Sequence, residues 1–238
     1  GDGPPASSWA LGVGAIAFDK AYAGIDRENM AIPFVQYENR WISIIGPQIG
    51  FKLLSLEPAP AHSINFDLVA RYDGSGYDDD DIEDTPILAG MRERKSGFWA
   101  GARIEWKSDW FDVTAEALGD ASGNSKGKRF NLGSEKTWHI GERMMITPRV
   151  AANWHDKKYV DYYYGVRADE VRPGRAAYQG ESGVNAEVGV RGIYMFDQRH
   201  SVFVDVEVTR LAKEIKDSPL VDKSTENRVF LGYLYRFK

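Results

Sequence analysis

Hydrophobic and polar residues alternate along most of this chain, and the segment from Gly183 to Ala212 shows the alternation most clearly. Between residues 184 and 196, valine, alanine, tyrosine and phenylalanine occupy even positions, whereas asparagine, glutamate and arginine occupy odd ones. After Asp197–His200 the alternation resumes, with valines at positions 202, 204, 206 and 208. A period of two is typical of a β-strand that has one apolar and one polar face. The segment is therefore predicted to form a β-hairpin closed by a tight turn.

The same reasoning predicts an all-β fold for the whole chain. Twelve strands are predicted, over residues 9–18, 31–37, 41–53, 62–72, 98–107, 111–117, 129–138, 146–154, 159–166, 184–196, 202–208 and 229–237. An even number of strands returns the C-terminus to the side of the N-terminus, and closing the sheet removes its free edges. We therefore expect a single domain over residues 1–238, an antiparallel β-barrel of about twelve strands, with ten strands as the alternative.

The positions of the tryptophans favour a transmembrane barrel over a soluble one. No run of about 18 apolar residues is present, so no membrane-spanning helix is predicted, but barrel strands need only roughly 9–11 residues. All seven tryptophans fall near predicted strand starts or ends: Trp9, Trp41, Trp99, Trp106, Trp110, Trp138 and Trp154. A soluble barrel is expected to fill its interior with large aromatic side chains. This pattern instead indicates aromatic girdles at the two membrane interfaces, with the apolar face against outer-membrane lipid.

If the apolar face contacts lipid, the polar face lines the lumen, and its charges are of both signs. The candidate lumen or binding residues are Asp67, Arg71, Arg103, Glu105, Arg149, Glu187, Arg191, Asp205 and Glu207. Opposite charges on facing strands can pair across a narrow lumen. We therefore expect the three arginines Arg103, Arg149 and Arg191 to pair with glutamates 105, 187 and 207 and to obstruct the lumen.

The segment Asp73–Lys95 does not alternate and is predicted to be a loop. It contains a run of acidic residues from Asp78 to Asp84, followed by a basic cluster. The glycine and terminal glutamate spacing of a calcium-binding loop is missing, and charge runs are usually solvated. Because four strands are predicted before residue 73, an N-terminus in the periplasm would place this loop at the periplasmic end. There it would act as a partial plug or as a docking surface for a partner.

Composition argues against catalysis, metal binding and nucleic-acid binding. The chain has no cysteine, which removes disulfides, thiolate catalysis and most structural zinc sites. The four histidines are scattered without metal-ligand spacing; Asn153 and His155 share a predicted strand face, but no serine motif accompanies them. The formal charge of −5 does not fit a nucleic-acid partner. No catalytic residue, metal or cofactor is therefore predicted.

Three short motifs resemble the MipA/OmpV family of MltA-interacting outer-membrane proteins. They are Asp161–Val166 (DYYYGV), Asp217–Lys223 (DSPLVDK) and the closing Tyr235–Phe237. The residues that carry the resemblance most specifically are Tyr162, Tyr163, Tyr164, Gly165, Asp217, Ser218 and Pro219. The tyrosine run could line a ligand mouth or belong to the interfacial aromatic belt.

The resemblance implies a barrel, expected to be monomeric, in the outer membrane of a Gram-negative bacterium. For one branch of the family it implies scaffolding of a lytic transglycosylase and a peptidoglycan synthase; other members are linked to adhesion or to antibiotic and peptide responses. The alternative function is a small-solute channel or a ligand-binding or antimicrobial-binding barrel with an ionic lumen. The polar start at Gly1–Pro5 is typical of a mature N-terminus. Lys238, after Phe237, departs from the aromatic end that is usual for such barrels.

Overall fold

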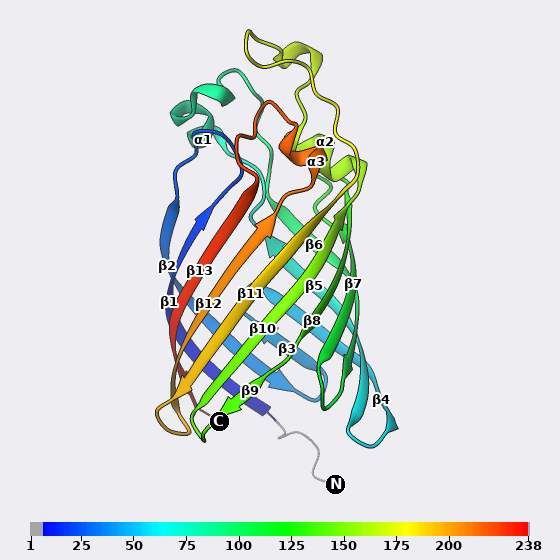
Figure 1. The fold of residues 1–238 in the computed structure, drawn as a ribbon, viewed down its shortest axis with the longest axis vertical. Coiled ribbons are helices and arrows are strands. Elements are labelled where there is room, and N and C mark those ends of the chain that lie inside the picture. The colour runs from blue at the N-terminus through cyan, green and yellow to red at the C-terminus, as the bar shows by residue number, and fades with distance from the viewer. Residues whose placement is uncertain (1–6, 238) are drawn as a thin grey trace.

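Thirteen strand segments, each antiparallel to its neighbours, form the wall of a closed barrel (Figure 1). The computed structural model describes residues 7–237, so the sequence features at Gly1–Pro5 and Lys238 lie outside the described residues. The segments are β1 (Ser7–Asp19), β2 (Glu28–Asn39), β3 (Ile42–Ile45), β4 (Gln48–Ala59), β5 (His62–Asp73), β6 (Gly97–Lys107), β7 (Asp112–Asp120), β8 (Lys128–Glu135), β9 (Trp138–Ile140), β10 (Met144–His155), β11 (Gly183–Met195), β12 (His200–Arg210) and β13 (Thr225–Arg236). Pairing of β13 with β1 and of β10 with β11 closes the ring. Since β8 and β9 pair with successive stretches of β10, they share one position, and the predicted total of twelve strands is confirmed.

Long links gather at one end of the barrel and short turns at the other. The links over residues 20–27, 74–96, 121–127, 156–182 and 211–224 lie at the upper end in Figure 1. Both described chain ends and turns such as 60–61 and 196–199 lie at the lower end. Outer-membrane barrels have short periplasmic turns and longer extracellular loops, so the upper end is extracellular. Of the helices in residues 7–237, none has the length and apolar character needed to cross a membrane.

The alternation predicted for the lipid-facing surface is confirmed in β11 and β12. Val188, Val204 and Val208 are exposed on the outside of the wall, whereas Asp205 between two of them is buried. The tryptophans at positions 9, 41, 110, 138 and 154 are also exposed. Trp99 is the exception to the predicted girdles, because it is fully buried and its ring lies 4.4 Å from the guanidinium of Arg129.

Two strand predictions are wrong, and their errors cancel in the count. The predicted strand 41–53 is interrupted at Gly46–Pro47, where Gly46 has a φ of +56°, and becomes the short β3 and the first half of β4. The predicted strand 159–166 is instead the helix α2 (Lys157–Tyr164). The Asp156 side chain caps this helix by accepting a hydrogen bond from the Tyr159 backbone N–H.

The division of residues 41–53 also reverses the predicted position of the acidic segment. Five strands precede residue 74, so the segment 74–96 lies at the extracellular end and the periplasmic prediction is wrong. The acidic run is not entirely a loop, because it contains α1 (Asp79–Asp84), which begins at a reciprocal capping box between Asp78 and Asp81. The 3-10 turn η1 (Pro86–Leu88) follows.

A cysteine at Asp80 tests this orientation, because the residue is exposed at the extracellular end. We expect Asp80→Cys to react with a membrane-impermeant maleimide in intact cells. Gln198→Cys, in an exposed turn at the opposite end, is the matched control and should react only after the outer membrane is permeabilised. The reverse pattern of labelling would show that the barrel has the opposite orientation in the membrane.

The lipid-facing assignment is tested at two adjacent residues of β12. Val204→Arg should strongly reduce folding yield in bilayers, because an arginine near the midplane of the lipid face costs about 2–4 kcal/mol. Asp205→Asn changes the neighbouring lumen side chain and should reduce the yield much less. Equal yields, measured by heat-modifiable gel migration, would contradict the assignment of the two faces.

Candidate functional site

The nine predicted lumen residues all lie on the inner face of the wall, and most belong to two ionic clusters. The first cluster spans β5, β6 and β7. Arg71 Nη1 lies 2.9 Å from Glu116 Oε1, and Arg103 lies 3.5 Å from Asp67 and 4.0 Å from Glu116. Glu116 is thus the shared acceptor of two arginines, although the sequence did not single it out as a site residue.

The second ionic cluster spans β10 to β13 and centres on Arg149. This guanidinium donates to both carboxylate oxygens of Asp205, at 2.7 and 2.8 Å, and to Glu207 at 2.8 Å. Glu187 is 3.9 Å away, and Arg228, which sequence analysis missed, donates to Glu207 at 2.9 Å. The pairing predicted for Arg149 is therefore present.

The guanidinium of Arg149 lies against the wall because β11 has a glycine there: a Cβ at Gly189 would come within 2.6 Å of it.

The remaining two arginine pairings were predicted with the wrong partners. Glu105 pairs with Lys107 at 3.3 Å, and Arg103 pairs with the acidic residues of the first cluster. Arg191 pairs with Glu135 at 3.8 Å. Antiparallel register explains the partners of Arg103, because Asp67 and Glu116 lie directly opposite it on β5 and β7. The other two pairs have different origins: Lys107 is on the same strand as Glu105, and the Arg191–Glu135 pair spans β10.

Three phenylalanines form an apolar surface on the inner side of β2, β12 and β13. The rings of Phe34, Phe203 and Phe230 lie with their centroids 5.0 to 5.7 Å apart. Each ring packs over a glycine of an adjacent strand, since a Cβ at Gly12, Gly232 or Gly14 would overlap one of them. The lumen therefore has an aromatic side and an ionic side. Sequence analysis missed this aromatic side, and the glycines at inward positions of these strands were the signal that could have predicted it.

A cap of extracellular segments covers the outer mouth of the barrel. We define the cap as residues 20–27, 74–96, 156–182 and 211–224. It contains most of the buried apolar side chains of the protein, among them Tyr22, Leu88, Val160, Ile215 and Leu220. Helix α3 (Lys213–Lys216) and the 3-10 turn η2 (Ala168–Glu170) belong to it. The main apolar core thus lies above the barrel, in the segments that the alternation did not describe.

Two of the three family motifs, Asp161–Val166 and Asp217–Lys223, lie in this cap, where they join its segments, whereas Tyr235–Phe237 lies at the periplasmic end of β13. The hydroxyl of Tyr22 donates to the Tyr163 carbonyl at 2.7 Å, and the Ser218 hydroxyl donates to the Tyr164 carbonyl at 2.6 Å. The hydroxyl of Tyr162 accepts from the Lys95 backbone N–H at 2.8 Å. The tyrosine run therefore connects four chain segments and is packed into the cap, instead of being exposed as an interfacial belt would be. Gly165 is tightly packed: a Cβ there would lie 2.2 Å from the Asp161 carbonyl oxygen. Asp217 and Pro219 lie beside Tyr178 at a surface hollow.

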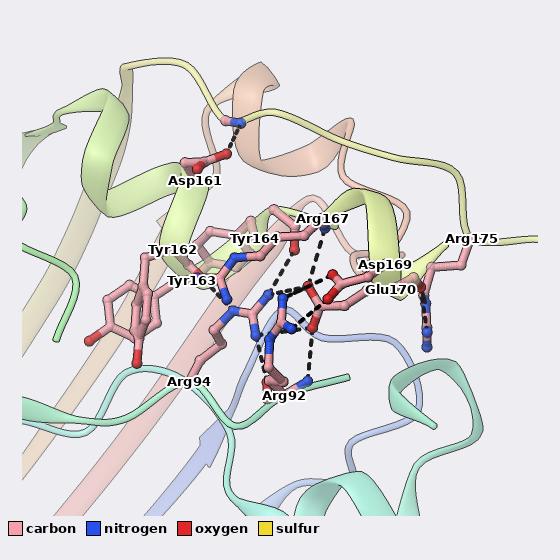
Figure 2. Close-up of polar contacts among 12 residues, drawn as sticks. Arg92, Arg94, Asp161, Tyr162, Tyr163, Tyr164, Arg167, Asp169, Glu170 and Arg175 are labelled. Carbon is pink, nitrogen blue, oxygen red and sulfur yellow. Dashed lines mark hydrogen bonds and ion pairs between the residues drawn. The ribbon is translucent and has the colours of Figure 1, made fainter. Parts of the chain in front are cut away.

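A buried ion pair between Arg94 and Glu170 holds the centre of the cap (Figure 2). The two groups are 2.8 Å apart, and each side chain is no more than 2% exposed. Arg94 also donates to the Tyr162 carbonyl at 2.7 Å, and Glu170 accepts from the backbone N–H groups of Arg92 and Arg167. Burial by itself would raise the pKa of the Glu170 carboxyl, but these hydrogen bonds outweigh burial and hold its pKa at about 2.

Two cavities remain beneath the cap. The upper cavity, of about 360 Å³, lies directly under it and is lined by Tyr22, Tyr159 and Tyr164. The lumen cavity, of about 690 Å³, is lined by both ionic clusters. The paired side chains therefore narrow the lumen without filling it.

Asn153 and His155, which share a strand face, have different contacts. Asn153 donates a hydrogen bond to Glu187 at 3.0 Å in the second ionic cluster. His155 stacks on Tyr159 beneath the cap, with ring centroids 4.4 Å apart.

The chain is similar to several known proteins. A family model described as MltA-interacting protein MipA matches residues 11–237. A putative outer membrane protein YiaT of Escherichia coli K12 is 27% identical, covering 98% of this chain and 92% of the relative. The MltA-interacting protein of the same strain is 25% identical, covering 96% and 90%. An outer membrane channel from Pseudomonas putida F1 superimposes with a TM-score of 0.49 at 12% identity, covering 99% of this chain and 97% of the channel.

The low pKa of Glu170 gives the cap a defined dependence on pH. Because the folded pKa is below the ordinary value, the stabilising contribution is complete above about pH 4.5 and is lost as the pH falls through about 2. We expect hydrogen-exchange protection factors of residues 156–182 to fall over this range. Glu170→Gln should lower them already at neutral pH, because removing one partner of a buried ion pair costs about 3–5 kcal/mol.

Asp169→Asn is the matched control for this measurement. Asp169 also pairs with an arginine, Arg92, but its side chain is 65% exposed. Exposed ion pairs contribute only about 0–1 kcal/mol, so this variant should retain nearly all the protection. Equal loss of protection in the two variants would contradict a special role for the buried pair.

Proposed function

The chain belongs to the family of the MltA-interacting protein MipA, and we propose that it is a non-enzymatic anchor that holds a peptidoglycan-remodelling enzyme at the inner surface of the outer membrane. Its location in the outer membrane follows from its fold and from relatives that are named outer membrane proteins. The proposal concerns the role of the barrel in that membrane.

The observation that carries the proposal is the closed extracellular end. The cap has a packed apolar core and a buried ion pair, and the lumen walls below it are lined by paired charges. A barrel built to conduct solutes freely would be expected to keep a wide, water-filled lumen. A closed barrel is better suited to anchoring a protein partner at the membrane than to transport. The periplasmic turns are the surface available to a periplasmic partner.

The class of partner is suggested by one relative. The Escherichia coli protein that is 25% identical to this chain is named for its interaction with MltA. We propose that a lytic transglycosylase is likewise the primary partner of this chain, and that a peptidoglycan synthase joins the same assembly. The described periplasmic turns carry charges of both signs, including Arg40, Asp109, Glu142, Arg143 and Asp197. Such a surface favours a polar, reversible contact over an obligate apolar one.

Binding to a purified lytic transglycosylase of the source organism tests the proposal. The barrel is placed in nanodiscs, and a short epitope is inserted after Ala61, Asp109 or Gln198 in three periplasmic turns, each in a separate variant. At least one insertion should weaken binding tenfold or more. The same insertion after Gly174, in an exposed extracellular loop, is the control and should leave binding unchanged. Absence of binding by the unmodified barrel, or loss of binding only with the Gly174 insertion, would contradict the proposal.

A second candidate function, a small-solute channel or ligand-binding barrel, is favoured by the lumen cavity of about 690 Å³. Planar bilayer recordings separate the channel from the anchor. A closed barrel should give no discrete conductance steps, whereas Glu170→Gln, which loosens the cap, should give intermittent ones. Stable steps with the unmodified protein would favour the channel.

A further inference from the structure

The barrel wall is incomplete beside β2 because β3 is only four residues long. On one side β2 pairs with β1 along nearly its whole length, but on the other it pairs with β3 only at residues 36–38. The Gly46 N–H then donates to the Val35 carbonyl, and the Tyr72 N–H donates to the Pro47 carbonyl. Above this turn, no strand pairing is present for residues 28–34 of β2 on that side, within the part of the chain that the structure describes. We call this gap the wall notch.

The borders of the wall notch follow from where the strands end. Beyond Pro47, β3 and β4 are absent and β5 continues only to Asp73, whereas β2 continues to Glu28 without a partner on this side. The cap borders the notch from above, where Lys20 Nζ donates to the Gly76 carbonyl at 2.8 Å. The notch is therefore a gap in the outer part of the wall, bordered by β2, the Gly46–Pro47 turn and the cap.

Exposure and lining residues indicate that the wall notch leads into the barrel. Met30 points inward, since it pairs with Ile16 of the upper cavity, yet it is 47% exposed. Tyr72 belongs to the lipid-facing side of β5, yet it lines the lumen cavity together with Pro47 and Gly74. Pro33 lies within β2, and proline is tolerated in strands chiefly at unpaired edges. Unpaired backbone at membrane depth is tolerated where it borders a wet cavity.

The chemistry changes sharply between the outside of the wall notch and the cavity behind it. Outside, the rings of Tyr72 and Phe98 lie 5.5 Å apart on the lipid-facing surface. Inside, five arginines and four carboxylates line the lumen cavity, an excess of one positive charge. Among the described residues, the buried Nε atoms of Arg103 and Arg129 have no hydrogen-bond partner. Both atoms are N–H donors, so the group that would satisfy them is an acceptor.

We propose that the wall notch is a lateral binding port for a single-chain amphiphile with an anionic head group. The head group, a carboxylate or a phosphate ester, enters the lumen cavity from the outer leaflet and accepts hydrogen bonds from Arg103 and Arg129. The acyl chain remains in the notch and in the lipid, against Met30, Tyr72 and Phe98. The port is independent of the anchor function, because it uses the upper half of the barrel and none of the periplasmic turns.

The test uses a hexadecanoic acid that carries a photoreactive diazirine in its chain, incorporated into nanodiscs with the full-length protein. Mass spectrometry of the crosslinked peptides should show saturable labelling concentrated on β2 and on the region of Tyr72. The corresponding hexadecanol probe has the same chain without the anionic head. It should label the lipid-facing strands evenly, and preferential labelling at the notch by the alcohol would overturn the assignment of the head-group site.

Two pairs of variants separate the port from general lipid contact. Arg103→Gln should reduce notch labelling at least fivefold, whereas Arg191→Gln changes a lumen arginine that lies outside both cavities and should not. Gly74→Trp should obstruct the notch, because a side chain there has open space within 4 Å. Gly119→Trp also enters open space, but on the far side of β6, and should leave labelling unchanged.

The folded fraction of every variant is measured first by heat-modifiable migration, so that labelling is compared per folded molecule. Unchanged labelling in folded Arg103→Gln would overturn the proposal, as would even labelling around the barrel by the acid probe. Excess sodium acetate should not displace the probe. Displacement by acetate would show that the donors bind free carboxylates, and it would overturn the role of the notch.

Discussion

Backbone hydrogen bonding in a medium without water is the constraint on which the rest of this structure depends. Within the hydrocarbon region an unpaired N–H or C=O group costs several kcal/mol, so a sheet can cross a membrane only when it closes on itself. Pairing of β13 with β1 and of β10 with β11 achieves this closure. The same constraint makes the short β3 notable, because an unpaired strand edge at membrane depth is tolerated only where it is buried in protein or borders a water-filled cavity.

The interior follows from the closure, because a narrow ring leaves little room for inward side chains. The chain meets this limit by placing glycine beneath its largest inward groups. Arg149 lies over Gly189, and Phe34 lies over Gly12. Charged groups that face the lumen are partly removed from water, and each arginine of the two ionic clusters lies against at least one carboxylate.

The cap is stabilised differently from the barrel wall. It lies outside the lipid, so its segments must bury their apolar side chains against one another in a core of their own. Its tyrosines bury their rings while their hydroxyl groups remain bonded, as Tyr22 shows with the Tyr163 carbonyl. The Arg94–Glu170 pair is costly to bury, yet it satisfies several carbonyl and N–H groups of otherwise irregular loops. Two of the three family motifs, Asp161–Val166 and Asp217–Lys223, belong to this part of the molecule.

The sequence alone determined the class of fold, because a two-residue period is a local property that the strands express directly. The valines of β12 and the position of Asp205 on the opposite face could be derived from it, whereas the total of twelve strands was correct because two errors cancelled. Local pattern could not distinguish α2 from a strand, since four aromatic residues in a short run suit either, and the Asp156 cap and the neighbouring loops decided the outcome. Nor could it locate the turn at Gly46–Pro47, which reversed the side assigned to the acidic segment. Partners of the lumen charges depend on register between strands, and the cap, the cavities and the wall notch depend on contacts between segments far apart in sequence. Only the tertiary structure specifies those relations, because each is set by how several elements meet in space.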